Sequence, residues 1–139
     1  MKKNIVIVDP FPRTMDLIFS KQKLKSLKSK FKLIHAPKIM QKKFYEKNIN
    51  KASFIIGQPN LPRSLLAKAK KLKAVINVES NFMSNIDYNY CLNKGIHVIA
   101  TSPVFSKPVA EIALGMTLSL LRNIHNAHFD FIKGKEKYG

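Results

Sequence analysis

The sequence of 139 residues is poor in several residue types, and each shortage removes a class of site. Its single cysteine, Cys91, has no second thiol with which to form a disulfide inside the chain. Its five glycines include no G-x-G pair, which excludes a dinucleotide-binding glycine fingerprint and a phosphate-binding P-loop from these residues. Its four histidines and Cys91 lack the paired spacing of metal ligands, so we expect no metal site.

Arginine and acidic residues are also scarce. The chain has 25 Lys and Arg against 8 Asp and Glu, a net charge of +17, yet only Arg13, Arg63 and Arg122 are arginine. Arginine makes the bidentate contacts to phosphate and guanine that nucleic-acid recognition favours. The lysines are instead spread along the chain, which indicates lysine-coated, solvated helix faces. Nucleic-acid binding is therefore the least favoured functional hypothesis for this chain.

Long apolar runs are missing as well. The run near the N-terminus spans only residues 5–8 before Asp9, whereas a signal peptide needs about 7–15 apolar residues. No run approaches the roughly 20 residues of a membrane span. Together with the single cysteine, this predicts a cytoplasmic protein without a membrane partner.

What the chain does have is a series of short apolar, β-branched runs separated by helical patterns. They predict strands at residues 4–8, 31–35, 53–56, 74–78 and 96–100. The spacing between them predicts helices from Thr14 to Leu27, with Thr14 as a possible N-cap, and at 39–47, 64–71 and 87–93, the last closed by Gly95. Such alternation is typical of an α/β fold with a parallel sheet and helices on both faces.

The carboxyl ends of such strands are where ligands bind. The loops there are residues 9–12, 57–60, 79–85 and 101–106. A phospho-receiver domain shares this topology and would use Asp9. It would also need a second acidic residue there, an aspartate ending the third strand and a lysine ending the fifth, and the sequence has none of these.

A long helix from about Ser106 to Asn123 is apolar nearly all round, which predicts burial on more than one side. Gly115 lies within it, where glycine costs about 1 kcal/mol relative to alanine, so we expect another backbone to pack closely there. The residues after it, 130–139, read as a polar, frayed tail. The helix therefore predicts a partner that these residues do not supply.

Residues 72–124 resemble the D-isomer-specific 2-hydroxyacid dehydrogenase family. The matching motifs stand in order: an apolar strand, Asn85-Ile86-Asp87, a short helix closed by Lys94-Gly95-Ile96, a strand ending in Thr101-Ser102-Pro103, and Val109-Ala110-Glu111 with Ala113-Leu114-Gly115 on the next helix. The strand and helix pattern of residues 1–71 is compatible with this resemblance.

The resemblance implies a two-domain oxidoreductase that transfers a hydride between the CH–OH group of a 2-hydroxy acid and NAD or NADP. Residues 1–103 would form the flavodoxin-like substrate domain. Residues 104–139 would form the helix that crosses to a Rossmann domain and joins two subunits of a homodimer, and the start of that cofactor domain. The catalytic arginine, acid and histidine of the family, and its glycine fingerprint, would lie beyond residue 139, so this chain would be inactive alone.

The resemblance also places the substrate carboxylate on backbone N–H groups of the loop after the fourth strand, at Glu79, Ser80, Asn81 and Phe82. Many family members have glycines there. Glu79 would put a negative charge beside an anionic substrate, so either it points away or the substrate is unusual. Asn77 and Asn81 are candidate polar partners, or they satisfy the loop backbone.

Two residues of the long helix have a double interpretation. Ser106 sits where the family approaches the nicotinamide, and it also reads as a helix N-cap. Glu111 either faces the domain cleft or only favours the N-terminal part of the helix. A second functional hypothesis comes from another class: a free-standing flavodoxin-like module that binds a small carboxylate or a protein and dimerises through residues 109–124.

Overall fold

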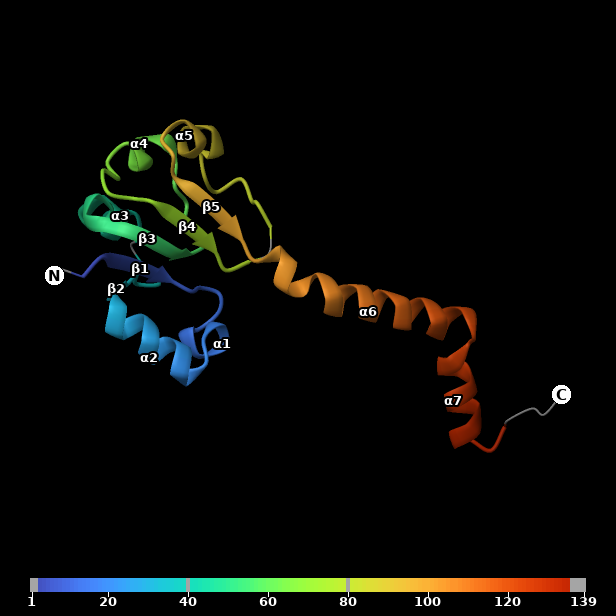
Figure 1. The fold of residues 1–139 in the computed structure, drawn as a ribbon. Helices are drawn as coiled ribbons and strands as arrows, with labels where there is room; N and C mark the ends of the chain where they lie inside the picture. Colours follow the sequence, from blue (N-terminus) through green and yellow to red (C-terminus); the bar gives the residue numbers. More distant parts are fainter. Residues whose placement is uncertain (1–2, 40, 80, 136–139) are drawn as a thin grey trace. The chain divides into compact units, whose positions relative to one another are not determined.

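Five parallel strands form a single sheet in the computed structural model, which describes residues 3–39, 41–79 and 81–135. The chain divides into two compact units, Met1–Ser102 and Pro103–Gly139, and the sheet belongs to the first. Its strand order is β2-β1-β3-β4-β5 (Figure 1). The strands are β1 (Ile5–Asp9), β2 (Lys32–His35), β3 (Ala52–Gly57), β4 (Ala74–Asn77) and β5 (His97–Ala100). All five predicted strands are confirmed, with small shifts at their ends.

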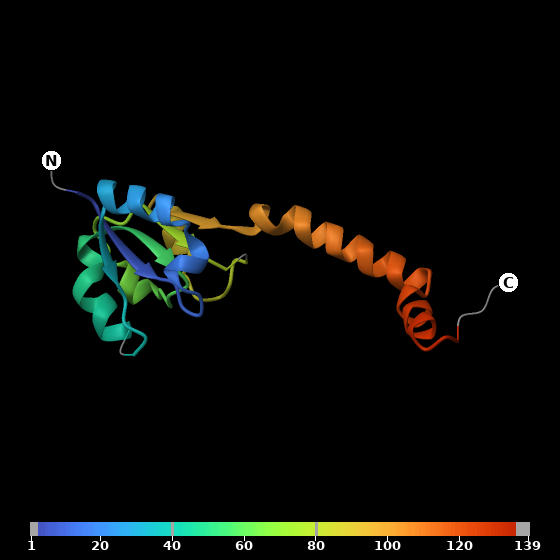
Figure 2. The same cartoon turned by 90° about the horizontal axis from the view of Figure 1, so that it is seen from below.

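Helices cover both faces of the sheet (Figures 1 and 2). One face carries α1 (Met15–Ile18) and α2 (Lys21–Lys30). The other carries α3 (Gln41–Asn48), the short 3-10 helix η1 (Ile49–Lys51), α4 (Arg63–Leu66) and α5 (Tyr88–Asn93). The predicted α/β architecture with a doubly covered parallel sheet is therefore confirmed.

The helices before β2 and before β4 differ from the sequence prediction. A single helix from Thr14 to Leu27 is wrong, because the chain leaves the helical conformation at Phe19 and starts again after Ser20. The Ser20 side chain accepts a hydrogen bond from the Lys23 N–H at 3.3 Å, which begins α2. Thr14 occupies the N-cap position of α1 but makes no capping hydrogen bond. The predicted helix at 64–71 is shorter as well, since α4 ends at Leu66.

Alternation along the strands explains the two cores, because successive side chains point to opposite faces. Ile7, Ile55 and Val75 face α3, α4 and α5, and Val6, Val8 and Ile56 face α1 and α2. Cys91 is buried in the first core, as the sequence predicts. The α1 and α2 side does not extend over β5, where Ile99 remains 50% exposed.

The second unit consists mainly of α6 (Ser102–Leu121) and α7 (Ile124–Ile132). The two helices are separated at Asn123, whose φ of 52° is left-handed and interrupts the helix. The expectation of a frayed tail from residue 130 is wrong for Asp130–Ile132, which continue α7. No described residue of α6 is buried.

Helix α6 is long and apolar enough to cross a membrane, judged by length and composition alone. This qualifies the sequence-based view that no segment approaches a membrane span. Core helices of soluble proteins have the same length and apolar composition. The chain has Lys107 and Glu111 within this helix, and both would have to enter the bilayer.

Candidate substrate site at the carboxyl edge of the sheet

The carboxyl ends of β1, β3, β4 and β5 meet at one edge of the sheet, because the strands are parallel and in register. Asp9 of β1 pairs with Gly57 of β3, and Asn77 of β4 pairs with Ala100 of β5. The loops after these strands are therefore neighbours. Within the first unit, this brings together the predicted ligand loops at residues 9–12, 57–60 and 79–85.

Gly57 is required by the close approach of β1 and β3. Its φ is +154°, and a Cβ atom added to it would lie 2.2 Å from the backbone oxygen of Asp9. Any other residue would be strained and would overlap that carbonyl. The end of β3 is thereby held against the end of β1, and Gln58 follows directly at the edge.

Asp9 is a buried carboxylate at this edge, 4% exposed. The Tyr45 hydroxyl donates a hydrogen bond to Asp9 Oδ2 at 3.1 Å, and the Gln41 side-chain amide donates one to Oδ1 at 3.1 Å. Burial raises the pKa of Asp9 above its usual range, and the hydrogen bond from Tyr45 opposes that increase. Burial and the Asp9 charge raise the pKa of Tyr45, which remains a neutral donor.

No local pattern in the sequence connects Asp9 with these two donors. Asp9 attracted attention only because it follows the first strand, and the acidic partners of a receiver domain are absent. Gln41 and Tyr45 lie 32 and 36 residues away along the chain. Only the packing of α3 over β1 places their side chains beside the carboxylate.

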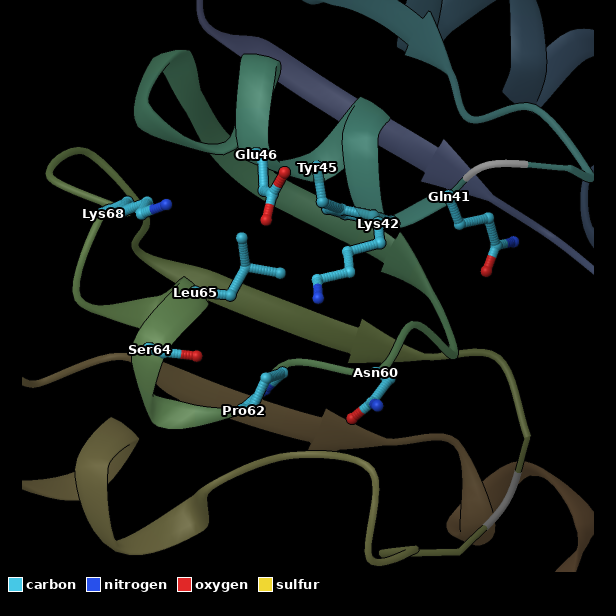
Figure 3. A pocket seen from close by; sticks show the side chains of 9 residues that line it. All are labelled: Gln41, Lys42, Tyr45, Glu46, Asn60, Pro62, Ser64, Leu65 and Lys68. Carbon is cyan, nitrogen blue, oxygen red and sulfur yellow. The ribbon is translucent and has the colours of Figure 1, made fainter.

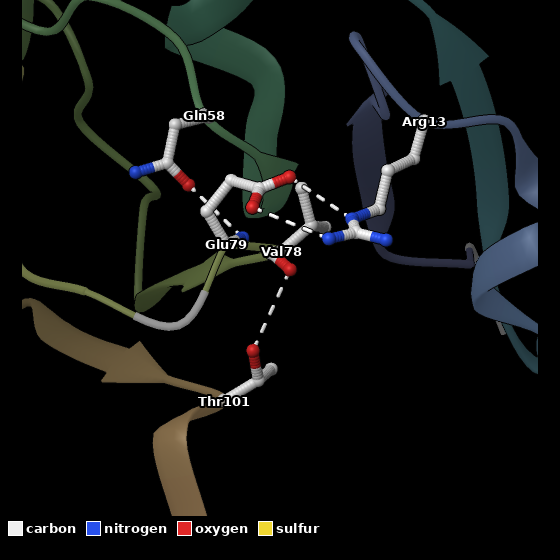
Figure 4. Close-up of polar contacts among 5 residues, drawn as sticks. All are labelled: Arg13, Gln58, Val78, Glu79 and Thr101. Carbon is white, nitrogen blue, oxygen red and sulfur yellow. Dashed lines mark hydrogen bonds and ion pairs between the residues drawn. The ribbon is translucent and has the colours of Figure 1, made fainter. Parts of the chain in front are cut away.

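Glu79, in the loop after β4, forms an ion pair with Arg13 from the loop after β1 (Figure 4). Arg13 Nε donates to Glu79 Oε1 at 2.9 Å, and Nη2 donates to Oε2 at 3.4 Å. The hydrogen bond and the charge of Glu79 raise the pKa of Arg13. The negative charge that seemed to conflict with an anionic substrate is thus balanced by an arginine. Sequence reasoning missed Arg13 in this role, because 66 residues separate the partners.

The backbone N–H of Glu79 already has an acceptor, since it donates to Gln58 Oε1 at 3.3 Å (Figure 4). On the other side of this loop residue, the Thr101 hydroxyl lies 3.5 Å from the carbonyl oxygen of Val78, to which it donates. The start of the loop is therefore held from both neighbouring strands. Among the four predicted backbone donors, the N–H of Glu79 is therefore engaged within the protein.

The other three predicted site residues of the loop after β4 are Ser80, Asn81 and Phe82. Ser80 lies outside the described residues. Asn81 is exposed, and Phe82 is 63% exposed with its ring packed edge-to-face on Tyr88, the centroids 5.8 Å apart. The Tyr88 hydroxyl donates to the backbone oxygen of Met83, which anchors the second half of the loop.

Buried side-chain amides lie beneath the loop with part of their hydrogen-bonding capacity unused. Asn77, fully buried at the end of β4, has no partner for either amide atom among the described residues, and the same holds for Gln58 Nε2 and Asn85 Oδ1. Burial raises the pKa of the neighbouring Tyr88, and the Asn77 side chain opposes that increase without a hydrogen bond of normal geometry. The Asn85 amide nitrogen donates to the Pro59 oxygen at 2.7 Å.

Ser106 and Glu111 belong to the second unit and are described only within it. The N-cap interpretation of Ser106 is wrong, because α6 begins earlier, at Ser102, and Ser106 lies inside it. Its hydroxyl donates to the Pro103 oxygen at 2.9 Å. The turn expected at Pro103 is helical instead, since proline is tolerated in the first turn of a helix. Glu111 pairs with Lys107 one turn earlier at 3.9 Å.

A separate cavity of about 480 Å³ lies between α3 and α4 (Figure 3). Lys42 and Glu46 of α3 face it, together with Asn60 from the loop after β3. Its remaining lining residues are Gln41, Tyr45, Pro62, Ser64, Leu65 and Lys68. No group of histidine, cysteine and acidic side chains in the described part of the chain is arranged to hold a metal ion.

Comparison with solved structures shows what this chain resembles. It is 39% identical, with a TM-score of 0.86, to a phosphoglycerate oxidoreductase from Rhizobium etli, over 99% of this chain and 43% of that one. A 2-hydroxyacid dehydrogenase from Ketogulonicigenium vulgare shares the fold at 17% identity and a TM-score of 0.72, over 100% of this chain and 43% of that one. A D-lactate dehydrogenase from Aquifex aeolicus, complexed with NAD and lactic acid, aligns at 20% identity and a TM-score of 0.59, over 98% and 39%.

The chain thus spans less than half the length of these proteins. No protein-family model matches it. No curated protein matches it either.

Proposed function

This chain belongs to the D-isomer-specific 2-hydroxyacid dehydrogenase family, and from that premise we propose that it supplies the substrate domain of an NAD- or NADP-dependent oxidoreductase acting on the CH–OH group of a 2-hydroxy acid. The observation that carries the proposal is the 39% identity to the Rhizobium etli oxidoreductase over 99% of the chain. Phosphoglycerate and lactate, named for two of the similar proteins, are the first substrates to consider.

In this proposal the loop after β4 holds the substrate carboxylate through backbone N–H groups, at residues 79–82. Backbone donors suit the task because their direction is fixed and they do not titrate. The ion pair between Arg13 and Glu79 supports this role, since it balances the one acidic side chain of the loop. Because the Glu79 N–H already donates to Gln58, we assign the carboxylate mainly to the N–H groups that follow it.

The glycines of this chain include no G-x-G pair with which to hold a nicotinamide cofactor. The Ser106 hydroxyl donates to the Pro103 oxygen and can still accept a hydrogen bond, so its predicted contact with the nicotinamide stays a prediction. We therefore propose that a cofactor domain outside these residues holds NAD or NADP and supplies the catalytic arginine, acid and histidine. On this view the chain alone catalyses no hydride transfer, because the cofactor must be held against the substrate.

Helix α6 is the proposed connection to that domain and to a second subunit. Its apolar side chains are exposed all round, with Val109, Ile112 and Leu114 each about 60% exposed. A surface of this kind marks an interface. The likeness to the Rhizobium etli protein covers 99% of the chain and so includes this helix, which favours an interface in a cytoplasmic dehydrogenase dimer over a membrane span.

A free-standing module that binds a small carboxylate or a protein is the second candidate. It is favoured by the first unit having two cores of its own, one under each helical layer. In this version α6 would serve only to dimerise the chain. We prefer the dehydrogenase proposal, because a free-standing binding module would not explain why the sequence is similar to an oxidoreductase along 99% of the chain.

The experiment compares the complete gene product with the 139-residue chain. Both are incubated with NADH or NADPH and either pyruvate or a phosphorylated 2-oxo acid, and cofactor oxidation is followed by absorbance. We expect turnover from the complete product only, and a coding sequence after Gly139 that contains G-x-G-x-x-G followed by arginine, an acid and histidine. A complete product that ends at Gly139, or that leaves the cofactor unoxidised with every 2-oxo acid, would overturn the proposal.

A further inference from the structure

The cavity between α3 and α4 is a candidate ligand site that the proposed dehydrogenase function does not use. Its lining comes from α3, from the loop after β3 and from the segment around α4, and no described residue of the loop after β4 belongs to it. Its volume of about 480 Å³ falls in the range of about 300–1,000 Å³ that small-molecule sites occupy. It is therefore large enough for a metabolite.

Opposite charges project into this cavity from one helix. Lys42 and Glu46 are one turn apart on α3, and the side chains of both point into the cavity (Figure 3). The ion pairs within the described part of the chain are Arg13–Glu79 and Lys107–Glu111, so these two charges are not paired with each other. Lysine placed before glutamate at this spacing is the less favourable order for a helical ion pair. Both charged groups are exposed to solvent and therefore accessible to a ligand.

The rest of the lining adds an apolar wall and neutral polar groups. Leu65 is buried at 8% exposure and Tyr45 at 2%, and both line the cavity. Ser64 and Asn60 offer a hydroxyl and an amide, and Lys68 adds a second positive charge. An anion without a positive group would meet Glu46, and a cation without a negative group would meet the lysines. A zwitterion with an apolar substituent satisfies all parts of the cavity.

We infer that this cavity binds a free α-amino acid, with its carboxylate against Lys42, its ammonium group against Glu46 and its side chain against the wall formed by Leu65 and Tyr45. The site does not depend on the proposed dehydrogenase function. It also touches the carboxyl edge of the sheet, because Gln41 and Tyr45 line the cavity and donate hydrogen bonds to Asp9.

The test is an NMR titration of the 139-residue chain, labelled with ¹⁵N, against each common L-amino acid at constant pH and ionic strength. We expect at least one amino acid to shift the amide signals of α3 and of residues 60–68 in a saturable way. Its analogues that lack the amino group or the carboxylate should bind at least about tenfold more weakly, because each leaves one charge of the cavity without a partner. No saturable shift with any amino acid would overturn the inference.

Variants that remove one charge from the cavity provide a second test in the same titration. Lys42→Gln and Glu46→Gln should each weaken the binding of the amino acid about tenfold or more, whereas Lys43→Gln and Lys47→Gln, on the same helix but outside the cavity lining, should leave it unchanged. Unchanged affinity in both cavity variants would contradict the assignment. All four positions are exposed, so denaturant unfolding should show the same stability in each variant. No cofactor or 2-oxo acid is present, so the result is independent of the test of the proposed function.

Discussion

The strands of the sheet and helix α6 are both rich in apolar residues, yet they differ completely in burial. Ile7 and Val8 of β1 are 0% exposed, whereas Ile112 and Leu120 of α6 are 62% and 68% exposed. The strands find their partners within the chain, because helices follow on both faces of the sheet. Helix α6, taken within its own unit, buries none of its residues. An apolar pattern therefore predicts that a partner exists, without predicting that the same chain provides it.

Two glycines give the largest expected contrast between the units. Gly57→Ala should lower the free energy of unfolding by about 2–6 kcal/mol, because the new Cβ combines an unfavourable positive φ with overlap on the Asp9 carbonyl. Gly115→Ala is the matched change in α6, where nothing lies within 4 Å of the added atom. It should leave the sheet unit unchanged and favour the helix by about 1 kcal/mol.

Urea unfolding of both variants, followed by circular dichroism, measures this contrast. A tolerated Gly57→Ala would contradict the close approach of β1 and β3. A large loss of stability in Gly115→Ala would show that α6 packs against another backbone, as the sequence predicts. That backbone would then belong to the same chain or to a second copy of it in the sample.

Isoleucine truncations give the next largest contrast. Ile7→Ala should cost about 2–5 kcal/mol, since it opens a cavity in the larger core. Ile112→Ala should change unfolding by no more than about 0.5 kcal/mol, because the side chain is mostly exposed. Sedimentation at the same concentrations separates stability from assembly, and weaker self-association of Ile112→Ala alone would locate the interface on α6. Equal stability losses in the two variants would abolish the distinction between the units.

The buried carboxylate predicts a smaller, pH-dependent effect. Because burial raises the pKa of Asp9 in the folded state, the folded protein binds this proton more tightly than the unfolded chain does. Protonated Asp9 therefore contributes to the free energy of unfolding. This contribution is fully present below the ordinary aspartate pKa of about 3.9 and is lost as the pH rises through the pKa of Asp9 in the folded protein. Unfolding titrations should show this decline in the native protein and not in Asp9→Asn.

Asp16→Asn, an exposed change on α1, is the control for that measurement. It should keep the decline of stability with pH seen in the native protein. A decline that persists in Asp9→Asn would mean that another group carries it.

The ion pair at the substrate loop has the smallest expected effect on stability, because both side chains are partly exposed, at 44% for Arg13 and 30% for Glu79. Arg13→Gln and Glu79→Gln should each change unfolding only slightly, and less at high salt. Their effect on function should differ: in the complete enzyme, Arg13→Gln should raise KM for the acid substrate, and the double variant should restore it partly. An unchanged KM in Arg13→Gln would mean that the ion pair of Arg13 with Glu79 does not contribute to substrate binding.

The sequence was sufficient for the sheet and insufficient for its polar contacts. Short apolar runs separated by turns located all five strands, since a parallel strand buried on both faces has that pattern. The start of α6 was misplaced, because Pro103 reads equally as a turn and as a first helical turn. The contacts of Asp9 with Tyr45 and of Arg13 with Glu79 join residues 36 and 66 positions apart. No local pattern encodes such pairs.

The candidate site was located by resemblance more than by pattern. The resemblance pointed to the loop after β4 and raised the question of the Glu79 charge, and the ion pair with Arg13 answers that question. The Asn77 amide and Gln58 Nε2 have no partner among the described residues. The sequence does not predict this, because it does not show which polar groups folding leaves without partners. The role of residues 79–82 in holding a carboxylate stays a prediction.

The most direct test of the contrast between the two units is to cut the chain after Ser102 and compare the fragment with the 139-residue chain by sedimentation velocity and urea unfolding. We predict that residues 1–102 are monomeric and keep the unfolding free energy of the sheet unit, while the 139-residue chain associates through α6. An unstable 1–102 fragment together with a monomeric 139-residue chain would contradict the account, because it would mean that α6 completes the core of its own sheet.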